Sequence, residues 1–322
     1  MLPAKDHVTI CFAHVAYQLQ DRFVLRHPDI RSFEVRDRAA LDRRVGEADV
    51  LVVSGLWHNG LVEKARRLRY VQSIGAGTDQ FPRAALAERG IRLASGRGVN
   101  ARAVSEHAMA LVLALVRKLP EAGRNQAQKL WRGMIGDISQ REDELGGKTL
   151  LIVGIGGIGG RLARLAKAFD MQVIGLRKRP AAGAECADAV HGIEDLPRLL
   201  PEVDFVALTC PLTPETENLI DAATLDRMRA TSYLINVARG RVVDEVALIA
   251  ALRAGRIAGA ALDVTVEEPL PPSSPLWDMP NVLITPHTAG ETQRYEDNVL
   301  DILDENLERL WRGEGTLRNQ IV

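Results

Sequence analysis

The sequence predicts an α/β fold built from two domains, each containing a doubly wound parallel sheet. Short apolar or β-rich runs alternate with polar helical stretches along the whole chain, as expected for parallel strands joined by crossover helices. A chain of 322 residues is also too long for one typical hydrophobic core. A glycine-rich turn at 154–159 lies near the middle of the chain, so a substantial domain precedes it.

The first third of the chain is expected to form the smaller domain, of about 100 residues. Polar helical stretches at 61–68 and 82–89 separate its apolar runs. The strands expected here are 7–12, 49–53, 70–74 and 91–94. A second series of apolar runs is long enough for a sheet of six or seven strands, and it comprises 149–153, 172–176, 203–208, 233–237, 259–264 and 282–285.

The last helical segment suggests that the first domain is discontinuous. Residues 292–311 are predicted to form a long amphipathic helix that ends at Gly313. Because this helix follows a complete second sheet, we expect it to return to the first domain. The first domain then comprises 1–100 plus 287–322, and the second comprises 101–286. Ligands are expected in the cleft between them, beyond the carboxyl ends of the strands.

Composition excludes several classes of protein. A net charge of −1 gives no reason to expect nucleic acid or an acidic membrane as a partner. The three cysteines lie far apart without a CxxC pair, which argues against a disulfide framework or a metal site and indicates the reducing cytoplasm. The first residues lack the apolar region of a secretory signal. The apolar run 103–116 is shorter than the ~20 residues of a membrane span, so we interpret it as a buried helix and part of a homodimer interface.

The glycine-rich turn follows an apolar run and precedes a helical stretch, which is the order found at dinucleotide sites. Its residues are Gly154-Ile-Gly156-Gly157-Ile158-Gly159. The first glycine permits a tight turn, the second lets the backbone approach a pyrophosphate, and the last lets helix and strand pack closely. The helix N-terminus then offers N–H donors to the phosphates. A purely structural glycine turn is the alternative.

The next expected strand ends in a basic turn. NAD-specific sites place Asp or Glu about 20 residues after the glycines, where it binds the ribose hydroxyls. This chain has Arg177, Lys178 and Arg179 there, and Asp170 lies before the strand and does not replace the missing acid. A guanidinium binds a 2′-phosphate that a carboxylate would repel. The turn therefore favours NADP over NAD, the alternative being a solvated turn in an enzyme that accepts both.

Polar clusters follow three strands of the second half, at 236–241, 263–269 and 285–290. Taken singly, Arg239 is explained as a solvated loop cation, Glu268 as a surface acid and His287 as a helix-entry residue. Taken together, they bring a fixed cation, a carboxylate and an imidazole to one rim of one sheet.

Several motifs, in a consistent order, resemble the D-isomer-specific 2-hydroxyacid dehydrogenase family over nearly the whole chain. Besides the glycine turn, they are Gly75-Ala-Gly-Thr-Asp79, Asn100-Ala-Arg-Ala-Val-Ser-Glu-His107, Pro211-Leu-Thr-Pro-Glu-Thr216, Asn236-Val-Ala-Arg-Gly240, Glu268-Pro-Leu270 and Pro286-His287. The resemblance implies a Rossmann cofactor domain inserted into a flavodoxin-like substrate domain. It also implies hydride transfer between the nicotinamide C4 and the C2 of a 2-oxo or D-2-hydroxy acid.

The resemblance assigns roles that the chemistry can support. His287 is expected to act as the acid/base, because a histidine can protonate a developing alkoxide near neutral pH. Glu268 fits as its carboxylate partner, since the Glu-Pro-Leu motif selects it over the adjacent Glu267. Arg239 can clamp the substrate carboxylate and polarise its carbonyl through a planar fork.

Other predicted contacts carry weaker arguments. Backbone N–H groups around Ala76 and Gly77 would complete the carboxylate site, unless this loop is only a tight turn. Asp263 would receive the nicotinamide amide, with a turn-capping aspartate as the alternative. We interpret His107 as a satisfied core histidine rather than a catalytic one. Family motifs extend the predicted cofactor contacts to Cys210, Pro211, Thr216, Val237, Ala238 and Gly290.

Substrate identity stays open at this point. The cofactor argument favours NADPH-driven reduction of glyoxylate- or hydroxypyruvate-like acids. Leu56 and Trp57 would favour a small or apolar substituent if they line the pocket, but core packing explains them equally well. The alternatives are a short-form phosphoglycerate dehydrogenase and a corepressor-like protein that binds dinucleotide and acts through protein interactions. Formate dehydrogenases depart from a glutamate at the position of Glu268, which argues against that activity.

Overall fold

The computed structural model describes residues 2–180, 183 and 185–322. The chain divides into two compact units, Met1–Asn100 with Thr292–Val322, and Ala101–Glu291. Residues 287–291 therefore belong to the second unit rather than to the first. The reason is local hydrogen bonding, because the His287 N–H donates to the Asp263 carbonyl at 2.8 Å and the Ala289 N–H donates to the Asp263 carboxylate at 3.1 Å.

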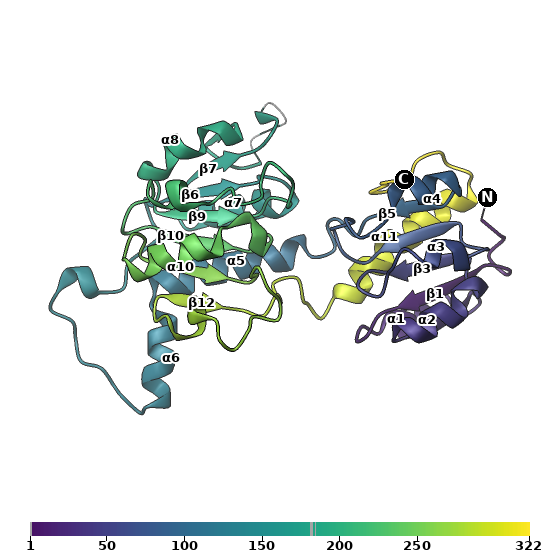
Figure 1. Ribbon diagram of the computed structural model, residues 1–322, viewed down its shortest axis with the longest axis horizontal. Coiled ribbons are helices and arrows are strands. Elements are labelled where there is room, and N and C mark those ends of the chain that lie inside the picture. The colour runs from purple at the N-terminus through teal and green to yellow at the C-terminus, as the bar shows by residue number, and fades with distance from the viewer. Residues whose placement is uncertain (1, 181–182, 184) are drawn as a thin grey trace. The chain divides into compact units, whose positions relative to one another are not determined.

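The first unit contains a five-stranded parallel sheet in the order β2-β1-β3-β4-β5 (Figure 1). Helices cover both faces of this sheet. Successive residues of a strand point to opposite faces, and here the residues on both faces are apolar. Ile10 and Phe12 pack with α1 and α11 on one face, whereas Cys11 and Ala13 face the cluster that contains α2, α3 and α4. The elements are β1 Thr9–Ala13, α1 Leu19–Arg26, β2 Arg31–Val35, α2 Arg38–Arg44, β3 Val50–Val53, α3 Leu61–Lys64, β4 Tyr70–Ser73, α4 Arg83–Glu88, β5 Arg92–Ala94 and α11 Tyr295–Trp311.

The helix α11 is joined to this sheet by a buried polar network as well as by apolar packing. The Asn306 side chain donates to the Tyr70 hydroxyl at 2.8 Å, and that hydroxyl donates to Gln72. All three residues are fully buried, so each polar group needs the partner it has. The network ties the C-terminal segment to strand β4.

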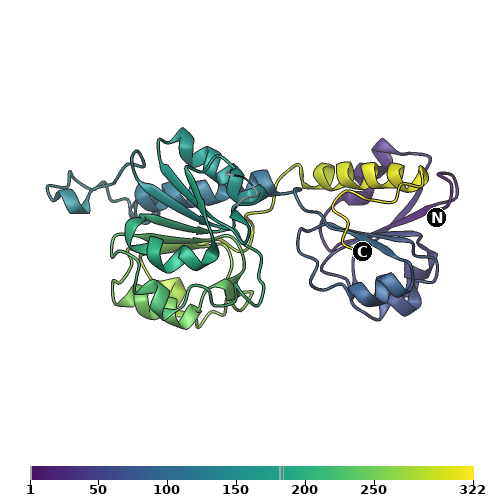
Figure 2. The same cartoon turned by 90° about the horizontal axis from the view of Figure 1, so that it is seen from above.

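The second unit contains a seven-stranded parallel sheet in the order β12-β11-β10-β9-β6-β7-β8. Figure 2 shows each sheet between two layers of helices. The two parallel-sheet units confirm the predicted fold class. The elements are α5 Ala101–Val116, α6 Leu119–Ala127, β6 Thr149–Val153, α7 Gly157–Ala168, β7 Gln172–Leu176, β8 Ala189–His191, α8 Leu196–Leu199, β9 Phe205–Leu208, α9 Ala222–Leu225, β10 Tyr233–Asn236, α10 Glu245–Arg253, β11 Gly259–Leu262 and β12 Val282–Ile284.

Two strands were not predicted, and both lie at an edge of their sheet. Strand β2 has one buried residue, and all three residues of β8 are half-buried. Edge strands face solvent on one side, so they lack the continuous apolar run by which central strands are identified. Short 3-10 segments complete the described structure at Val45–Glu47, Ile138–Gln140, Ile193–Asp195, Leu200–Glu202, Gly240–Val242 and Pro275–Asp278.

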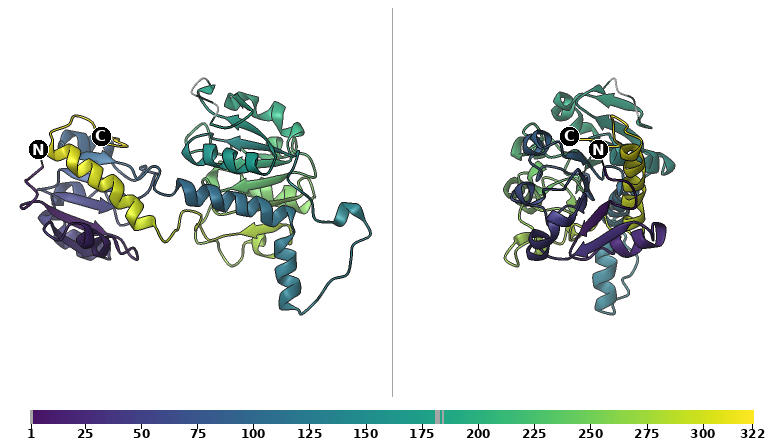
Figure 3. Two further views of the ribbon diagram at one scale, coloured as in Figure 1. Left: turned by 180° about the vertical axis from the view of Figure 1, so that it is seen from behind. Right: turned by 90° about the vertical axis from the view of Figure 1, so that its right-hand side faces the viewer.

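The helix α5 accounts for the long apolar run of the sequence. Its side chains Ala108 and Val112 are fully buried in a cluster shared with α7 and the sheet. Figure 3 shows α5 lying along the sheet beside α7. The run is thus explained by burial within the second unit. Among the described residues, no helix combines the length and apolar character needed to cross a bilayer.

A long arm follows α5. The helix α6 and the segment 128–144 extend away from the sheet of the second unit (Figure 3). None of the residues of α6 is buried. Several large apolar side chains of the arm are exposed, namely Leu119 at 56%, Leu130 at 54%, Trp131 at 97%, Met134 at 102% and Ile138 at 78%. Such a concentration of exposed apolar side chains is typical of a surface that another protein covers.

Candidate active site and cofactor site

The glycine turn between β6 and α7 has the geometry that a pyrophosphate requires. Gly154 has a φ of +99°, and a Cβ there would lie 2.6 Å from the Cys210 backbone. A Cβ at Gly159 would lie 2.6 Å from the Gly154 carbonyl oxygen, so helix and strand approach closely here. By contrast, a Cβ at Gly156 or Gly157 would meet nothing within 4 Å. The turn is therefore tight where it packs and open where a ligand would approach.

The amino terminus of α7 can serve this open side. Gly156 is its N-cap and makes no side-chain capping bond, so the first N–H groups of the helix have no side chain covering them. Ile158 is half-buried and packs against the core, whereas Gly156 and Gly157 are exposed. Free N–H groups at a helix N-terminus bind phosphate well. These residues fit a dinucleotide.

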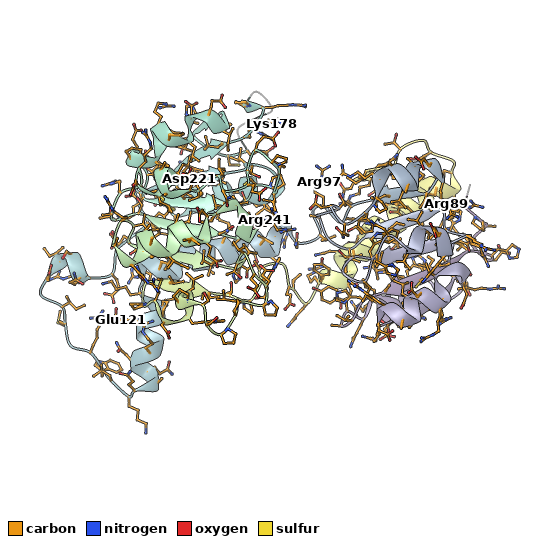
Figure 4. The ribbon with its side chains drawn as sticks, in the orientation of Figure 1. Arg89, Arg97, Glu121, Lys178, Asp221 and Arg241 are labelled. Carbon is orange, nitrogen blue, oxygen red and sulfur yellow. The ribbon has the colours of Figure 1, made fainter. Side chains whose placement is uncertain are left out.

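The basic turn after β7 is partly occupied by its own neighbours. Arg177 Nη1 donates to the Gly183 carbonyl at 2.9 Å. Lys178 Nζ lies 3.3 Å from Glu215 Oε1, and both side chains are well exposed, Lys178 extending outward from the unit (Figure 4). The Thr213 side chain, the Glu215 peptide N–H and Lys178 together lower the pKa of Glu215 to about 2. Arg179 is exposed. Glu215 is a residue of this region that the sequence analysis did not identify.

The loop 210–216 lies against the glycine turn. Burial raises the pKa of the Cys210 thiol to about 11, so this thiol is neutral near pH 7. The Thr216 hydroxyl donates to the Pro211 carbonyl at 2.7 Å and accepts from the Thr213 N–H at 2.8 Å. Thr216 thus holds its own loop together.

The three polar clusters lie at the carboxyl ends of β10, β11 and β12, which are consecutive neighbours in the sheet. Parallel strands bring their carboxyl ends to one edge, so the predicted grouping of the clusters follows from the topology. The edge carries Arg239 after β10, Asp263 and Glu268 after β11, and His287 after β12.

The Arg239 loop is built on Asn236. The Asn236 side chain accepts from the Ala238 N–H at 3.0 Å and donates to the Arg239 carbonyl at 3.0 Å. Val237 and Ala238 are buried, whereas the Arg239 side chain is exposed. A Cβ at Gly240 would lie 2.0 Å from the Thr265 carbonyl oxygen, so only glycine fits between the two loops. This close approach sets the Arg239 loop against the loop that leads to Glu268.

His287 and Glu268 form the expected pair. His287 Nδ1 lies 2.7 Å from Glu268 Oε2, and the Thr265 N–H donates to the other carboxylate oxygen at 3.1 Å. The carboxylate therefore receives the Nδ1 hydrogen and leaves Nε2 as the nitrogen available for proton exchange. The His287 side chain is 48% exposed, so Nε2 belongs to an accessible imidazole rather than a core one.

Asp263 is 2% exposed and caps the turn that carries His287. Its carboxylate accepts from the Thr288 N–H at 3.0 Å and from the Ala289 N–H at 3.1 Å. Of the two interpretations of Asp263, the structure shows the turn cap, and a contact with the nicotinamide amide stays a prediction. Gly290 follows directly on this turn and is half-buried.

The predicted residues of the first unit lie at the carboxyl ends of β3 and β4. Ala76 is exposed and Gly77 half-buried in the loop after β4, so backbone groups of this loop face solvent. Leu56 and Trp57 are 8% and 4% exposed and belong to the core, where the Trp57 ring lies 4.9 Å from the Phe81 ring. Core packing, one of the two explanations given for these residues, therefore accounts for both.

Some residues that shape the site had no recognisable signal of their own. Gly240 and Thr285 act through contacts between loops far apart in the sequence, with Thr265 and Asp263 respectively. The Thr265 N–H binds Glu268 within its own loop. Gly240 lies inside the motif at 236–240, whereas Thr265 and Thr285 lie inside the polar clusters at 263–269 and 285–290. Across the part of the chain that the structure describes, no group of three or more His, Cys, Asp or Glu residues could hold a metal ion.

Comparison with known proteins decides the family. The model of the D-isomer specific 2-hydroxyacid dehydrogenase NAD binding domain matches residues 109–289. The chain belongs to this family. The match confirms the resemblance drawn from the motifs, and the second unit of this 2-hydroxyacid dehydrogenase carries the nicotinamide dinucleotide-binding domain.

Relatives of this family member have several activities. It is 37% identical to a glyoxylate reductase of Korarchaeum cryptofilum over 254 residues, 78% of this chain and 76% of that protein. It is 37% identical over 287 residues to glyoxylate/hydroxypyruvate reductase B of Yersinia enterocolitica, covering 88% and 87% of the two chains. It is also 36% identical over 275 residues to a D-3-phosphoglycerate dehydrogenase of Methanocaldococcus jannaschii, covering 84% of this chain but 51% of that protein.

Solved structures show the same fold. A family member from Aeromonas salmonicida has a TM-score of 0.86 with 31% identity, covering 98% of this chain and 99% of that one. An NADPH-dependent glyoxylate/hydroxypyruvate reductase of Sinorhizobium meliloti in complex with NADP and malonate has a TM-score of 0.80 with 27% identity, covering 98% and 97%. A formate dehydrogenase of Staphylococcus aureus bound to NAD has a TM-score of 0.79 with 26% identity, covering 98% and 99%.

Proposed function

We propose that this protein reduces a small 2-oxo acid of the glyoxylate or hydroxypyruvate type to its D-2-hydroxy acid, with NADPH as the preferred reductant. The observation that carries the proposal is the hydrogen bond between His287 and Glu268, on the sheet edge of the unit that holds the glycine turn. In this proposal, 101–286 with the following turn is the cofactor domain, and 1–100 with the C-terminal helix is the substrate domain. The two reductases among the relatives support this substrate class.

Each residue has a chemical task in the reduction. Arg239 binds the substrate carboxylate and draws electron density from its carbonyl through a permanently charged guanidinium. On the first unit, the backbone N–H groups at Ala76 and Gly77 are assigned to substrate binding. A bound nicotinamide supplies the hydride to the substrate carbon. His287 Nε2 gives its proton to the alkoxide oxygen that develops, and Glu268 stabilises the imidazolium form that precedes this transfer.

The cofactor is held mainly by backbone groups of the second unit. We assign the pyrophosphate to Gly156, Gly157 and the start of α7, where a Cβ would meet no neighbour. The remaining cofactor contacts are assigned to Gly154, Ile158, Gly159, Cys210, Pro211, Thr216, Val237, Ala238, Arg239, Asp263, His287 and Gly290.

The preference for NADP rests on the turn after β7. Its residues Arg177 and Arg179 offer guanidinium groups where NAD-specific sites place a carboxylate. Lys178 contributes less, because Glu215 already lies 3.3 Å from its ammonium. The NADP-bound reductase and the NAD-bound formate dehydrogenase among the structural neighbours show that both cofactors occur on this fold.

We also infer that the protein forms a homodimer in the cytoplasm. The exposed apolar side chains of the arm, above all Trp131 and Met134, are suited to burial against a second copy. The three thiols are free, which suits a reducing compartment. Sedimentation of the wild type and of Trp131→Ser should show a dimer that the substitution weakens. A wild type that sediments as a monomer at micromolar concentration contradicts the inference.

A panel of 2-oxo acids assayed with both reduced cofactors tests the main proposal. Glyoxylate or hydroxypyruvate with NADPH should give the highest kcat/KM, and the glycerate formed from hydroxypyruvate should be the D isomer. Equal or faster turnover with NADH contradicts the cofactor preference. A preference for a phosphorylated 2-oxo acid would favour phosphoglycerate dehydrogenase instead. Dinucleotide binding without any turnover would favour the corepressor-like interaction protein.

A further inference from the structure

A chain of hydrogen bonds connects α5 with the turn that carries His287, entirely within the second unit. His107 Nε2 lies 2.9 Å from Thr285 Oγ1, and the Thr285 hydroxyl donates to Asp263 Oδ1 at 2.6 Å. Asp263 in turn accepts from the N–H groups of Thr288 and Ala289. Three hydrogen bonds, through Thr285 and Asp263, thus connect His107 with the backbone that immediately follows His287.

The numbers of hydrogen-bond donors and acceptors around Thr285 determine which ring nitrogen of His107 carries a hydrogen. The carboxylate of Asp263 accepts from two peptide N–H groups and from Thr285, so the single Thr285 hydroxyl hydrogen points toward Asp263. Thr285 Oγ1 can then only accept from His107. His107 Nε2 must therefore carry a hydrogen, which excludes the neutral tautomer protonated only at Nδ1.

The charge of Asp263 gives His107 a second task. A carboxylate that is 2% exposed is costly unless it is hydrogen-bonded or paired with a cation. His107 Nε2 lies 3.6 Å from Asp263 Oδ1, and no other Lys, Arg or His among the described residues lies within ion-pair distance of this carboxylate. The His107 N–H dipole, or its positive charge when protonated, therefore stabilises the buried anion on which the turn depends.

The turn itself needs to be held. His287 has a φ of +56°, in the left-handed region that a non-glycine residue adopts only when surrounding contacts impose it. The contacts that hold this turn are the hydrogen bonds from the His287 N–H to the Asp263 and Thr285 carbonyls, and those from the Thr288 and Ala289 N–H groups to the Asp263 side chain. If the Asp263 side chain changed its orientation, the turn would lose the hydrogen bonds that the Thr288 and Ala289 N–H groups donate to it.

We propose that His107 is a positioning residue which, through Thr285 and Asp263, fixes the backbone turn that aims the His287 imidazole at Glu268. This inference rests on the proposed function, in which His287 exchanges the proton. His107 itself does not touch the reacting atoms in this scheme. The sequence predicts that His107 is a core histidine with satisfied hydrogen bonds. In this proposal it also positions a group that takes part in the reaction.

Matched pairs of variants test the proposal. His107→Gln and Thr285→Ser keep the hydrogen-bonding groups, whereas His107→Leu and Thr285→Val remove them with little change in size. We expect His107→Leu and Thr285→Val to lower kcat roughly tenfold to a hundredfold, because small misplacements of a reacting group carry costs of this size. Their Tm should fall by only a few degrees, because Asp263 keeps its peptide N–H donors while losing one buried partner. His107→Gln and Thr285→Ser should keep most of the activity.

Two further measurements separate positioning from mere stability. The primary deuterium isotope effect on kcat, measured with 4-deuterated cofactor, should rise in His107→Leu because the chemical step slows. The double variant His107→Leu with Thr285→Val should be no slower than the worse single variant, since both act through one connection. Equal activity of the Leu and Gln variants, or additive losses in the double variant, overturns the proposal.

Nitrogen-15 NMR of the histidine rings tests the same connection without turnover. In the wild type, His107 should carry a hydrogen on Nε2, and His287 should show an Nδ1 hydrogen bonded to Glu268. The His287 signal should broaden or shift in His107→Leu and not in His107→Gln. An Nδ1-only tautomer at His107, or an unchanged His287 signal in the Leu variant, overturns the inference. A wild type that reduces no 2-oxo acid would contradict the proposed function alone, and these spectra would still decide the positioning.

Discussion

The turn that carries His287 and the basic turn after β7 differ in how firmly the chain holds them. The first is fixed by peptide hydrogen bonds to a carboxylate that is 2% exposed, and its imidazole is bound to Glu268 at 2.7 Å. The second has one charged pair, at 3.3 Å, whose Lys178 side chain is 83% exposed. Groups that exchange protons need fixed geometry, whereas groups that bind a phosphate can rely on long-range charge. Substitutions in the first turn should therefore cost far more than those in the second.

The largest effect is expected for His287→Ala. Without the acid/base, kcat/KM for the 2-oxo acid should fall by roughly 10²–10⁴-fold, while the Kd of the reduced cofactor, measured by fluorescence, should change little. His7→Ala is the matched control, because that side chain is 71% exposed and lies in the first unit. Undiminished turnover of His287→Ala would show that the active site lies elsewhere.

A backbone change at the same edge should come next. In Gly240→Ala the new Cβ would lie 2.0 Å from the Thr265 carbonyl oxygen, so the Arg239 and Glu268 loops must separate. We expect a destabilisation of about 1–3 kcal/mol, as for overpacked cores, measured by thermal unfolding, together with a fall in kcat/KM. Gly133→Ala is the control, since a Cβ there meets nothing within 4 Å. Wild-type activity in Gly240→Ala would mean that the contact between the two loops is not needed.

The basic turn should respond more mildly and only to one cofactor. Arg177→Ser with Arg179→Ser should raise the KM for NADPH roughly tenfold to a hundredfold, the value of one or two charge-assisted hydrogen bonds, and leave the KM for NADH nearly unchanged. Arg164→Ser removes an exposed charge from α7 and serves as the control. Parallel increases in both KM values would contradict a role in selecting the 2′-phosphate.

The smallest effect is expected for Glu215→Gln. This change frees Lys178 from an exposed partner. Exposed ion pairs are weak, so the KM for NADPH should fall by less than about fivefold. The pKa of Glu215 is lowered to about 2, so its carboxylate stays charged across the whole assay range and the effect should not depend on pH. A rise in the KM for NADPH would indicate that Glu215 supports the cofactor site instead of competing with the phosphate.

The sequence was sufficient to predict the role of a residue where that role depends on the residue type and on its neighbours in the chain. The glycine turn is an example, because the Gly154 and Gly159 contacts are demanded by a strand, a turn and a helix that are contiguous. The grouping of Arg239, Glu268 and His287 followed because the carboxyl ends of parallel strands share one edge.

The sequence was insufficient where tertiary packing determines the contacts and the burial of a residue. The carboxylate of Asp263 binds a turn that begins after a different strand, so its partners could not be read from spacing. The burial of Leu56 and Trp57 depends on Phe81 and the helices around them. Edge strands β2 and β8 lacked the apolar run of their central neighbours.

The return of the C-terminal segment to the first unit has a consequence for synthesis of the chain. The second unit, Ala101–Glu291, is contiguous and can fold as soon as it leaves the ribosome. The first unit cannot, because one face of its sheet is covered by Val299, Leu303 and Leu307 of α11, and β5 is bridged at Ala94 by Gln320. The first unit is thus begun before the second and completed after it, and one apolar face of its sheet stays uncovered until α11 has been synthesised.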